Sequence, residues 1–233
     1  MDQDIGKRLA AEEAAKYLER GMVLGLGTGS TAAHFVDIAG ARVAEGWPLK
    51  GVPTSETTRR QAALLGIEII EPDETTVIDL AVDGADEADP GLNLIKGGGA
   101  ALLREKIIAH AARKFIVIAD KSKRVTALGA FPLPVEISPY AWALTVAAMR
   151  RVLDEHGFSQ AKLAIRASDG VSVKTDGGNL IVDCALERIE NPGVLEKALN
   201  DIPGVLENGL FCGMADMIIY GSDDGVSTAA PRT

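Results

Sequence analysis

Apolar runs that alternate with amphipathic stretches dominate the first half of the chain. Runs such as "MVLGL", "VIDLAV" and "KFIVIAD" are typical of buried strands, and the stretches between them carry apolar residues at helical spacing. Helices are expected at 3–19, 31–46, 56–66 and 99–114. Strands that alternate with helices predict βαβ units and a mainly parallel sheet.

The pattern changes after about residue 130. The stretches 131–138, 161–167, 179–186 and 204–211 are expected to be strands, and 139–157 and 191–202 are expected to be helices. The order β-α-β-β-α-β is that of ferredoxin-like domains. The apolar run "ADMIIYG" near the end is expected to return to the first sheet.

The fold class predicted is therefore α/β, with two domains. A Rossmann-like, mainly parallel sheet domain is expected from 1–130 plus 208–233, and a smaller α+β ferredoxin-like domain is expected at 131–207, inserted before the last strand.

Composition narrows the classes of partner. Of the 233 residues, 47 % are apolar, and the formal net charge is −9, which argues against a nucleic-acid partner but not against a small phosphorylated ligand. No apolar run reaches the ~18 residues of a membrane span, and charged residues interrupt the first twenty positions, unlike a secretory signal. Cys184 and Cys212 have no metal-binding spacing and are interpreted as reduced thiols in strands. We expect a soluble cytoplasmic protein without a membrane partner.

A first candidate site is the turn in "GLGTGSTAAHF", residues 25–35. Its glycines allow a tight turn at a helix N-terminus, where backbone amides and the hydroxyls of Thr28, Ser30 and Thr31 could hold a phosphate. The turn is not a dinucleotide fingerprint, because Ser30 takes the place of the third glycine. The alternative is an ordinary turn in which Thr or Ser caps the helix.

A second candidate site lies in "VDGADEADPGLNLIKGGGAALLREK", residues 82–106. Asp83 should emerge at the carboxyl end of a strand, Asp86 follows in a loop, and Lys96 precedes a glycine run that leads into a helix. Carboxylates beside a lysine could exchange protons and stabilise an oxyanion. Glu87 and Asp89 are expected to be solvated loop residues.

Glu105 is a candidate base because of its place on the predicted helix. Its neighbours three and four positions away are apolar, so burial is expected to raise its pKa. The alternative is an ion pair with a buried cation. The opposite side of the helix is expected to be polar, with Lys106, His110, Arg113 and Lys114.

Two further groups bear on the chemistry of the site. Lys123 follows the strand "KFIVIAD" and could meet a phosphate or hydroxyl, although a solvated lysine is equally consistent with its position. The three histidines have no second His or Cys at ligand spacing, so no metal site is predicted.

Seven motifs, in order, resemble ribose-5-phosphate isomerase of type A. They are "GLGTGSTAAHF", "GVPTS", "VDGADEAD", "IKGGGAALLREK", "ADKSK", "LPVEI" and "GLFCGMADMIIYG". The resemblance extends from about residue 4 to residue 226. It implies interconversion of D-ribose 5-phosphate and D-ribulose 5-phosphate in the pentose phosphate pathway, without metal or cofactor.

The resemblance also implies roles for residues. Glu105 would move a proton between C2 and C1 through an enediolate, while Asp83, Asp86 and Lys96 would help to open the ring and stabilise the oxyanion. It does not indicate which aspartate opens the ring or which groups hold the phosphate, and it implies a homodimer or a dimer of dimers. The substrate-binding residues implied are Thr28, Gly29, Ser30, Thr31, Asp83, Gly84, Ala85, Asp86, Lys96, Gly97, Gly98, Gly99 and Lys123.

Two rival functions fit the sequence less well. A sugar-phosphate sensor of a transcriptional regulator would carry a DNA-binding helix-turn-helix before the first strand, for which the chain has no room. A nucleotide-dependent oxidoreductase is disfavoured by the missing third glycine.

Overall fold

The computed structural model describes residues 3–231 and divides into two compact units. The large unit comprises Met1–Ala85, Arg104–Arg124 and Gly213–Thr233, and the small unit comprises Asp86–Leu103 and Val125–Cys212. The small unit therefore includes Asp86–Leu103, which the predicted domain 131–207 leaves out. The predicted boundaries themselves stay a prediction.

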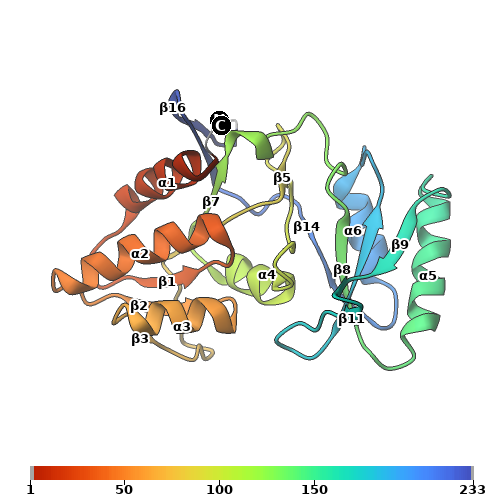
Figure 1. Ribbon diagram of the computed structural model, residues 1–233, viewed down its shortest axis with the longest axis horizontal. Coiled ribbons are helices and arrows are strands. Elements are labelled where there is room, and N and C mark those ends of the chain that lie inside the picture. Colours follow the sequence, from red (N-terminus) through yellow and green to blue (C-terminus); the bar gives the residue numbers. More distant parts are fainter. Residues whose placement is uncertain (1–2, 232–233) are drawn as a thin grey trace. The chain divides into compact units, whose positions relative to one another are not determined.

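The large unit is built on a seven-stranded sheet in the order β16-β15-β7-β4-β1-β2-β3 (Figure 1). All neighbouring strands are parallel except β16, which pairs antiparallel with β15. The strands are β1 (Val23–Leu26), β2 (Lys50–Pro53), β3 (Glu68–Ile69), β4 (Leu80–Asp83), β7 (Phe115–Asp120), β15 (Met217–Ser222) and β16 (Gly225–Ala229). The run "ADMIIYG" returns to this sheet as β15, so that prediction is confirmed, whereas β16 was not predicted.

Helices cover both faces of this sheet. Residues of α1, α2 and α3 form one buried cluster with Leu24, Leu26, Leu80 and Val82, the side chains on one face. On the other face, a Cβ on Gly25 would meet Ile108 of α4 at 2.5 Å, so glycine lets α4 approach the strand closely. The helices and short 3-10 turns are α1 (Gln3–Ala14), η1 (Ala15–Tyr17), α2 (Ser30–Ala44), α3 (Glu56–Leu64), α4 (Leu102–Ala111) and η2 (Lys121–Lys123).

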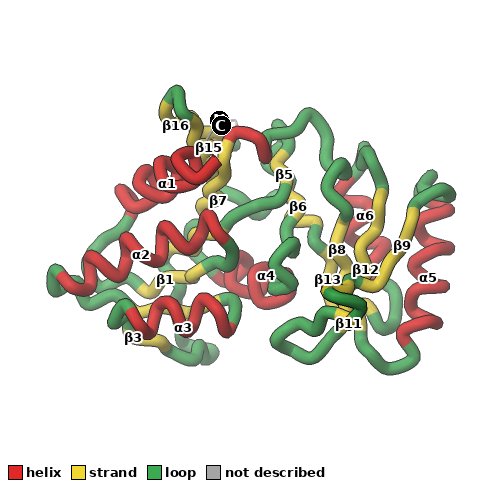
Figure 2. Tube along the Cα trace, viewed as in Figure 1, coloured by secondary structure: helices red, strands yellow, loops and turns green. Residues whose placement is uncertain are grey.

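The small unit contains a four-stranded antiparallel sheet in the order β13-β8-β12-β9. Its chain order is strand, helix, two strands, helix, strand, which confirms the predicted β-α-β-β-α-β arrangement (Figure 2). The elements are β8 (Leu133–Ile137), α5 (Trp142–Glu155), β9 (Lys162–Ile165), β12 (Leu180–Ala185), α6 (Pro192–Asn200) and β13 (Val205–Asn208).

Two smaller sheets complete this unit. One is a hairpin of β10 (Ala167–Ser168) and β11 (Val171–Ser172). The other has the order β14-β6-β5, formed by β5 (Glu87–Ala88), β6 (Leu94–Ile95) and β14 (Leu210–Phe211). The pairing of β6 with β14 brings the stretch after Asp86 together with a strand more than 100 residues later.

Strand β12 alternates between the core and the opposite face of the four-stranded sheet. Val182 and Cys184 belong to the buried cluster with Met149 and Leu195 of the two helices. Cys184 is fully buried, and its burial raises the pKa of the thiol to about 12. The interpretation of Cys184 as a thiol in a strand is confirmed, whereas it is wrong for Cys212, which lies just after β14 and outside a strand.

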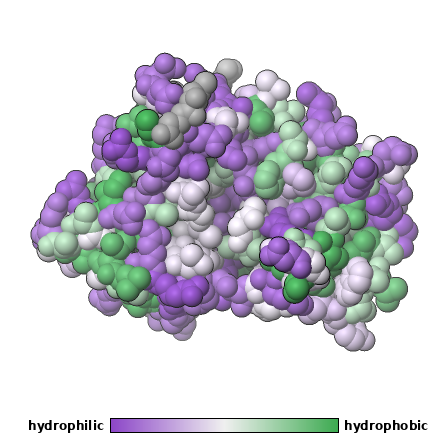
Figure 3. All heavy atoms as spheres, viewed as in Figure 1, coloured by the Kyte–Doolittle hydropathy of each residue, from purple (hydrophilic) through white to green (hydrophobic). Residues whose placement is uncertain are grey.

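Hydrophilic residues, in purple, cover much of the face seen in Figure 3, with apolar residues in separate patches. Among the described residues, no helix is long and apolar enough to cross a membrane.

Candidate active site

Asp83 is the last residue of β4 and is 3 % exposed. Its Oδ1 accepts hydrogen bonds from the backbone amides of Thr28, at 3.0 Å, and Gly84, at 2.7 Å. A Cβ on Gly27 would lie 2.3 Å from the Asp83 carboxyl carbon, so only glycine allows this approach. The carboxylate thus ties the turn after β1 to the end of β4, the edge where parallel sheets bind ligands.

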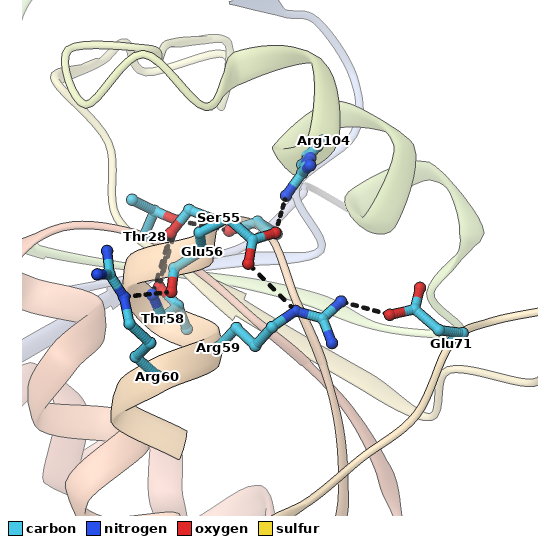
Figure 4. A network of polar contacts seen from close by, with 9 residues as sticks. Thr28, Ser55, Glu56, Thr58, Arg59, Arg60, Glu71 and Arg104 are labelled. Carbon is cyan, nitrogen blue, oxygen red and sulfur yellow. Dashed lines mark hydrogen bonds and ion pairs between the residues drawn. The ribbon is translucent and has the colours of Figure 1, made fainter. Parts of the chain in front are cut away.

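The hydroxyl of Thr28 belongs to a buried cluster beneath this turn (Figure 4). It lies 2.7 Å from the Thr54 hydroxyl and donates to the Ser55 hydroxyl at 2.9 Å. Ser55 donates to the hydroxyl of Thr58, which in turn donates to the carbonyl of Gly27 at 2.9 Å. The hydroxyl that the sequence suggested for a ligand is therefore engaged inside the protein, and a binding role for Thr28 would fall to its backbone.

The same turn begins α2. Gly29 is the N-cap, with φ of +105°, a conformation that favours glycine, and no side chain caps the helix. The alternative of a Thr or Ser N-cap is thus not what the structure has, and the first-turn amides keep the geometry of an anion site. Lys7 of α1 donates to the Ser30 hydroxyl at 3.0 Å. No local pattern points to Lys7, which reaches the turn only through tertiary packing.

Glu105 lies in the first turn of α4 and is 4 % exposed. The buried side chains Leu102, Ile108 and Ala109 surround it on the helix, as the periodicity predicted. The opposite face is less polar than expected, because Lys106 is also buried whereas Ile107 is 56 % exposed. The predicted helix 99–114 is shortened to Leu102–Ala111 because the glycine turn continues to Ala100, whose φ is +60°.

Ion pairs connect the start of α4 to the start of α3 (Figure 4). Arg104 pairs with Glu56 at 3.0 Å, and Arg59 lies 3.6 Å from the other oxygen of Glu56. Arg59 also contacts Glu71 at 2.5 Å. These partly exposed pairs join the helix of Glu105 to the helix whose first turn carries Ser55 and Thr58.

Lys123 follows β7, the neighbour of β4 in the parallel sheet. Asp120 ends the strand, and its Oδ1 accepts from the amide and the hydroxyl of Ser122, which forms the 3-10 turn that contains Lys123. Because parallel neighbours end at one edge, the half-buried Lys123 follows the same sheet edge as Asp83.

Asp86, Lys96 and the glycine turn 97–99 lie in the small unit. The amide of Asp86 donates to the Ile95 carbonyl, and its Oδ2 accepts from the Gly98 amide at 2.8 Å. Lys96 is 2 % exposed, and its ammonium lies 5.5 Å from the centre of the Phe211 ring, which is cation–π distance. Asp86 is thereby held directly against the turn that follows Lys96.

Glu87 was expected to be solvated, and this expectation is wrong. It is 4 % exposed and accepts hydrogen bonds from the amides of Gly129, at 2.7 Å, and Phe131, at 2.6 Å. A buried carboxylate that accepts hydrogen bonds from two amides of one loop holds that loop in place and is not part of a solvated surface. Asp89 also has partners, since it accepts from the amide and the side chain of Asn93.

Each unit thus assembles part of the predicted set. The large unit joins Asp83, Gly84 and the 28–31 turn at one sheet edge, and the small unit joins Asp86, Lys96 and the 97–99 turn. The chain passes between the units at Ala85–Asp86 and again at Leu103–Arg104, one residue before Glu105.

A Rossmann-like sheet whose carboxyl edge carries an amide-rich turn and a buried carboxylate has the parts of an enzyme site for a phosphorylated substrate. Comparison with known proteins narrows the class to one family. The family model described as ribose 5-phosphate isomerase A (phosphoriboisomerase A) matches residues 50–225.

Similar sequences and structures agree with that match. Ribose-5-phosphate isomerase A of Parvibaculum lavamentivorans is 50 % identical over 226 residues, 97 % of both chains, and that of Nitrobacter hamburgensis is 48 % identical over 232 residues, the full length of both. The structure of ribose 5-phosphate isomerase from Plasmodium falciparum has a TM-score of 0.93 at 31 % identity, covering 99 % of this chain and 100 % of its own.

The chain therefore belongs to the ribose 5-phosphate isomerase A family. The predicted family, the mixed α/β fold class and the assignment as an isomerase that interconverts D-ribose 5-phosphate and D-ribulose 5-phosphate are confirmed. The roles of individual residues stay predictions.

Proposed function

We propose that Glu105 is the base of this isomerisation and that the reaction passes through an enediolate. In the direction from ribose phosphate, the Glu105 carboxylate takes the proton from C2 and the electrons of that bond move toward the C1 carbonyl oxygen. The same carboxyl group then returns a proton to C1, and the proton of the C2 hydroxyl passes to the oxygen on C1, so that C2 becomes the carbonyl and C1 carries the hydroxyl. The observation that carries the proposal is the burial of this carboxylate, 4 % exposed, among apolar side chains.

Lys96 is proposed to stabilise the charge that develops on oxygen. Its ammonium is buried, where an electrostatic contact is stronger than in water. Asp83 and Asp86 are proposed to assist the opening of the ring by moving a proton between the ring oxygen and the C1 hydroxyl. Each of these carboxylates is held by backbone amides, which fixes its direction.

The phosphate is proposed to bind the 28–31 turn. The amides at the start of α2 are uncapped by side chains. Lys7 contacts Ser30, and Lys123 follows β7, two strands from β1 in the parallel sheet, so these two lysines are assigned to support the dianion. The sugar and its enediolate would then fall to Glu105, Asp83, Asp86 and Lys96.

The oligomer and the location belong to the same proposal. We propose a homodimer, as the resemblance implies, and exposed apolar side chains such as Tyr140, at 86 %, and Leu144, at 74 %, offer surface for it. A cytoplasmic location is supported by the two free thiols, Cys184 and Cys212. Light scattering coupled to size-exclusion chromatography tests the homodimer, and cell fractionation tests the cytoplasmic location.

The experiment that tests the function follows D-ribose 5-phosphate by proton NMR in heavy water, with protein treated by a metal chelator. We expect ribulose 5-phosphate to appear without added metal or cofactor, and its deuterium content at C1 reports exchange between Glu105 and solvent. Sugar phosphate that binds without turning over would instead favour the sensor, and dependence on a nicotinamide cofactor would favour the oxidoreductase.

A further inference from the structure

Arg166 is a charged residue of the small unit that the proposed reaction has not used. It follows β9, and its side chain is 15 % exposed. Its partner Asp183 lies on β12 between Val182 and Cys184, which face the core, so Asp183 points to the opposite face of the sheet. The pair therefore occupies the side of the four-stranded sheet that its two helices do not cover.

The two side chains meet in a fork. Arg166 Nε donates to Asp183 Oδ2 at 2.9 Å, and Nη2 donates to Oδ1 at 2.5 Å. A bidentate pair of this kind fixes the plane of the guanidinium as well as its place. It leaves Nη1 directed away from the carboxylate, and Nη1 donates to the carbonyls of Gly97, at 2.7 Å, and Gly98, at 3.0 Å.

The capture of these two carbonyls sets the direction of the next two amides. In a trans peptide the C=O and the following N–H point in opposite directions, and no cis bond is present among the described residues. The amide of Gly98 accordingly points away from Arg166 and reaches Asp86 Oδ2 at 2.8 Å. The same geometry directs the amide of Gly99 to the side on which Asp86 lies.

The turn needs this support because its backbone is unusual. Gly97 has φ of +107°, Ala100 has φ of +60°, and a Cβ on Gly98 would lie 2.7 Å from Asp86. Glycines also carry the most conformational freedom, so three in succession do not hold amides in one direction unaided. The guanidinium adds the constraint that the sequence of the turn lacks.

We propose that Arg166, oriented by Asp183, is a positioning residue for the isomerisation: it aims the Gly99 amide at the reacting oxygens of the sugar and, through the Gly98 amide, fixes the direction of the Asp86 carboxylate. The inference rests on the proposed function of the 96–99 segment. Arg166 itself does not touch the substrate in this role. Its effect is preorganisation, which matters where charge develops during the reaction.

The test compares Arg166→Met, Arg166→Lys and Asp183→Asn with the control Arg188→Met. Arg188 is an arginine of the same unit that also pairs with one carboxylate, Glu190 at 2.5 Å, but with a side chain that is 62 % exposed. The readouts are kcat, KM for ribose 5-phosphate, and the affinities for inorganic phosphate and for phosphoerythronic acid. The last is a ligand named in the solved structure of a 42 % identical isomerase, and its carboxylate resembles the paired oxygens of an enediolate.

For Arg166→Met we expect kcat to fall by about 10²-fold, because misdirected groups cost about this much in oriented catalysis. The affinity for phosphoerythronic acid should fall by a similar factor, whereas KM and the affinity for inorganic phosphate should change by less than about threefold. Arg166→Lys should recover only part of kcat, since an ammonium cannot form the fork and hold both carbonyls. The kcat of Asp183→Asn should lie between those of Arg166→Met and Arg166→Lys, and the kcat of Arg188→Met should match that of the parent protein.

A purely structural role would give a lower melting temperature with unchanged kcat and unchanged analogue affinity per folded active site, and this result would overturn the inference. If Arg166→Met does not fold, Arg166→Lys and Asp183→Asn decide on the same readouts. Failure of the proposed function is distinguishable, because the parent protein itself would then not isomerise ribose 5-phosphate.

Discussion

The two glycine turns of this protein are held in different ways. The 28–31 turn and the preceding Gly27 rest on neutral groups, the hydroxyls of Thr28, Ser55 and Thr58, together with the Asp83 carboxylate, which accepts from the Thr28 amide. The 97–99 turn rests on the guanidinium of Arg166, which captures its carbonyls.

The difference fits the charges proposed for the two ligands. A phosphate keeps its charge from binding to release, so uncapped amides at the start of a long helix suffice for it. An enediolate oxygen acquires its charge only during the reaction, and donors for it must already be aimed. The comparison therefore predicts that the first turn governs KM and the second governs kcat.

The largest effect should come from neither turn but from the base. Glu105→Gln should lower kcat by about 10⁴-fold, since the amide cannot carry the proton from C2 to C1, while sugar-phosphate binding persists. A stopped assay of product formation measures kcat, and an equilibrium binding measurement gives the affinity for the sugar phosphate. The matched control is Glu87→Gln, a change at another buried carboxylate, which should lower stability and leave kcat near the parent value. Ordinary turnover in Glu105→Gln would remove Glu105 as the base.

The next effect concerns Lys96, the residue before the second turn. Lys96→Ala should lower kcat by about 10²- to 10³-fold with a smaller change in KM, because the oxyanion exists only in the transition state and the intermediate. Lys123→Ala, at the edge assigned to the phosphate, should instead raise KM. Steady-state kinetics on both variants checks the division. A raised KM with unchanged kcat in Lys96→Ala would make this lysine a binding group only.

The sequence predicted the parts of the site that follow from local pattern. Asp83 was placed at the end of a buried strand by the apolar run before it, and Glu105 was placed on an apolar arc by helical periodicity. The order of strands and helices likewise predicted the mainly parallel sheet and the four-stranded sheet, but not the two smaller sheets.

The supports of the site could not be predicted in the same way, because they act across long stretches of chain. Arg166 lies 69 positions from Gly97, and Lys7 lies 23 positions from Ser30. Glu87 looked like a soluble loop residue because its partners, the amides of a loop 42 and 44 positions later, leave no mark in the local sequence. Only tertiary pairing gives these side chains their role.

A smaller effect should follow from the hydroxyl cluster under the first turn. Thr58→Val removes the donor to the Gly27 carbonyl and leaves buried polar atoms unsatisfied, which costs about 1–3 kcal/mol of folding free energy. We expect a raised KM with nearly unchanged kcat, together with a lower melting temperature. Thr57→Val is the matched control, an identical change at the exposed neighbouring position. A loss of kcat at constant KM would contradict the assignment of this turn to the phosphate.

The smallest effect should come from the exposed ion pairs. Glu56→Gln breaks the contacts of Glu56 with Arg104 and Arg59, whose side chains are 40 % and 35 % exposed. Pairs of this exposure contribute about 0.2–1 kcal/mol, so thermal unfolding should shift little and kcat should stay within about twofold of the parent value. Asp183→Asn, which breaks the more shielded pair of Arg166, should lower kcat far more. An equal loss of kcat in Glu56→Gln and Asp183→Asn would contradict this comparison. It would mean that the exposed pair of Glu56 matters as much for catalysis as the pair that orients Arg166.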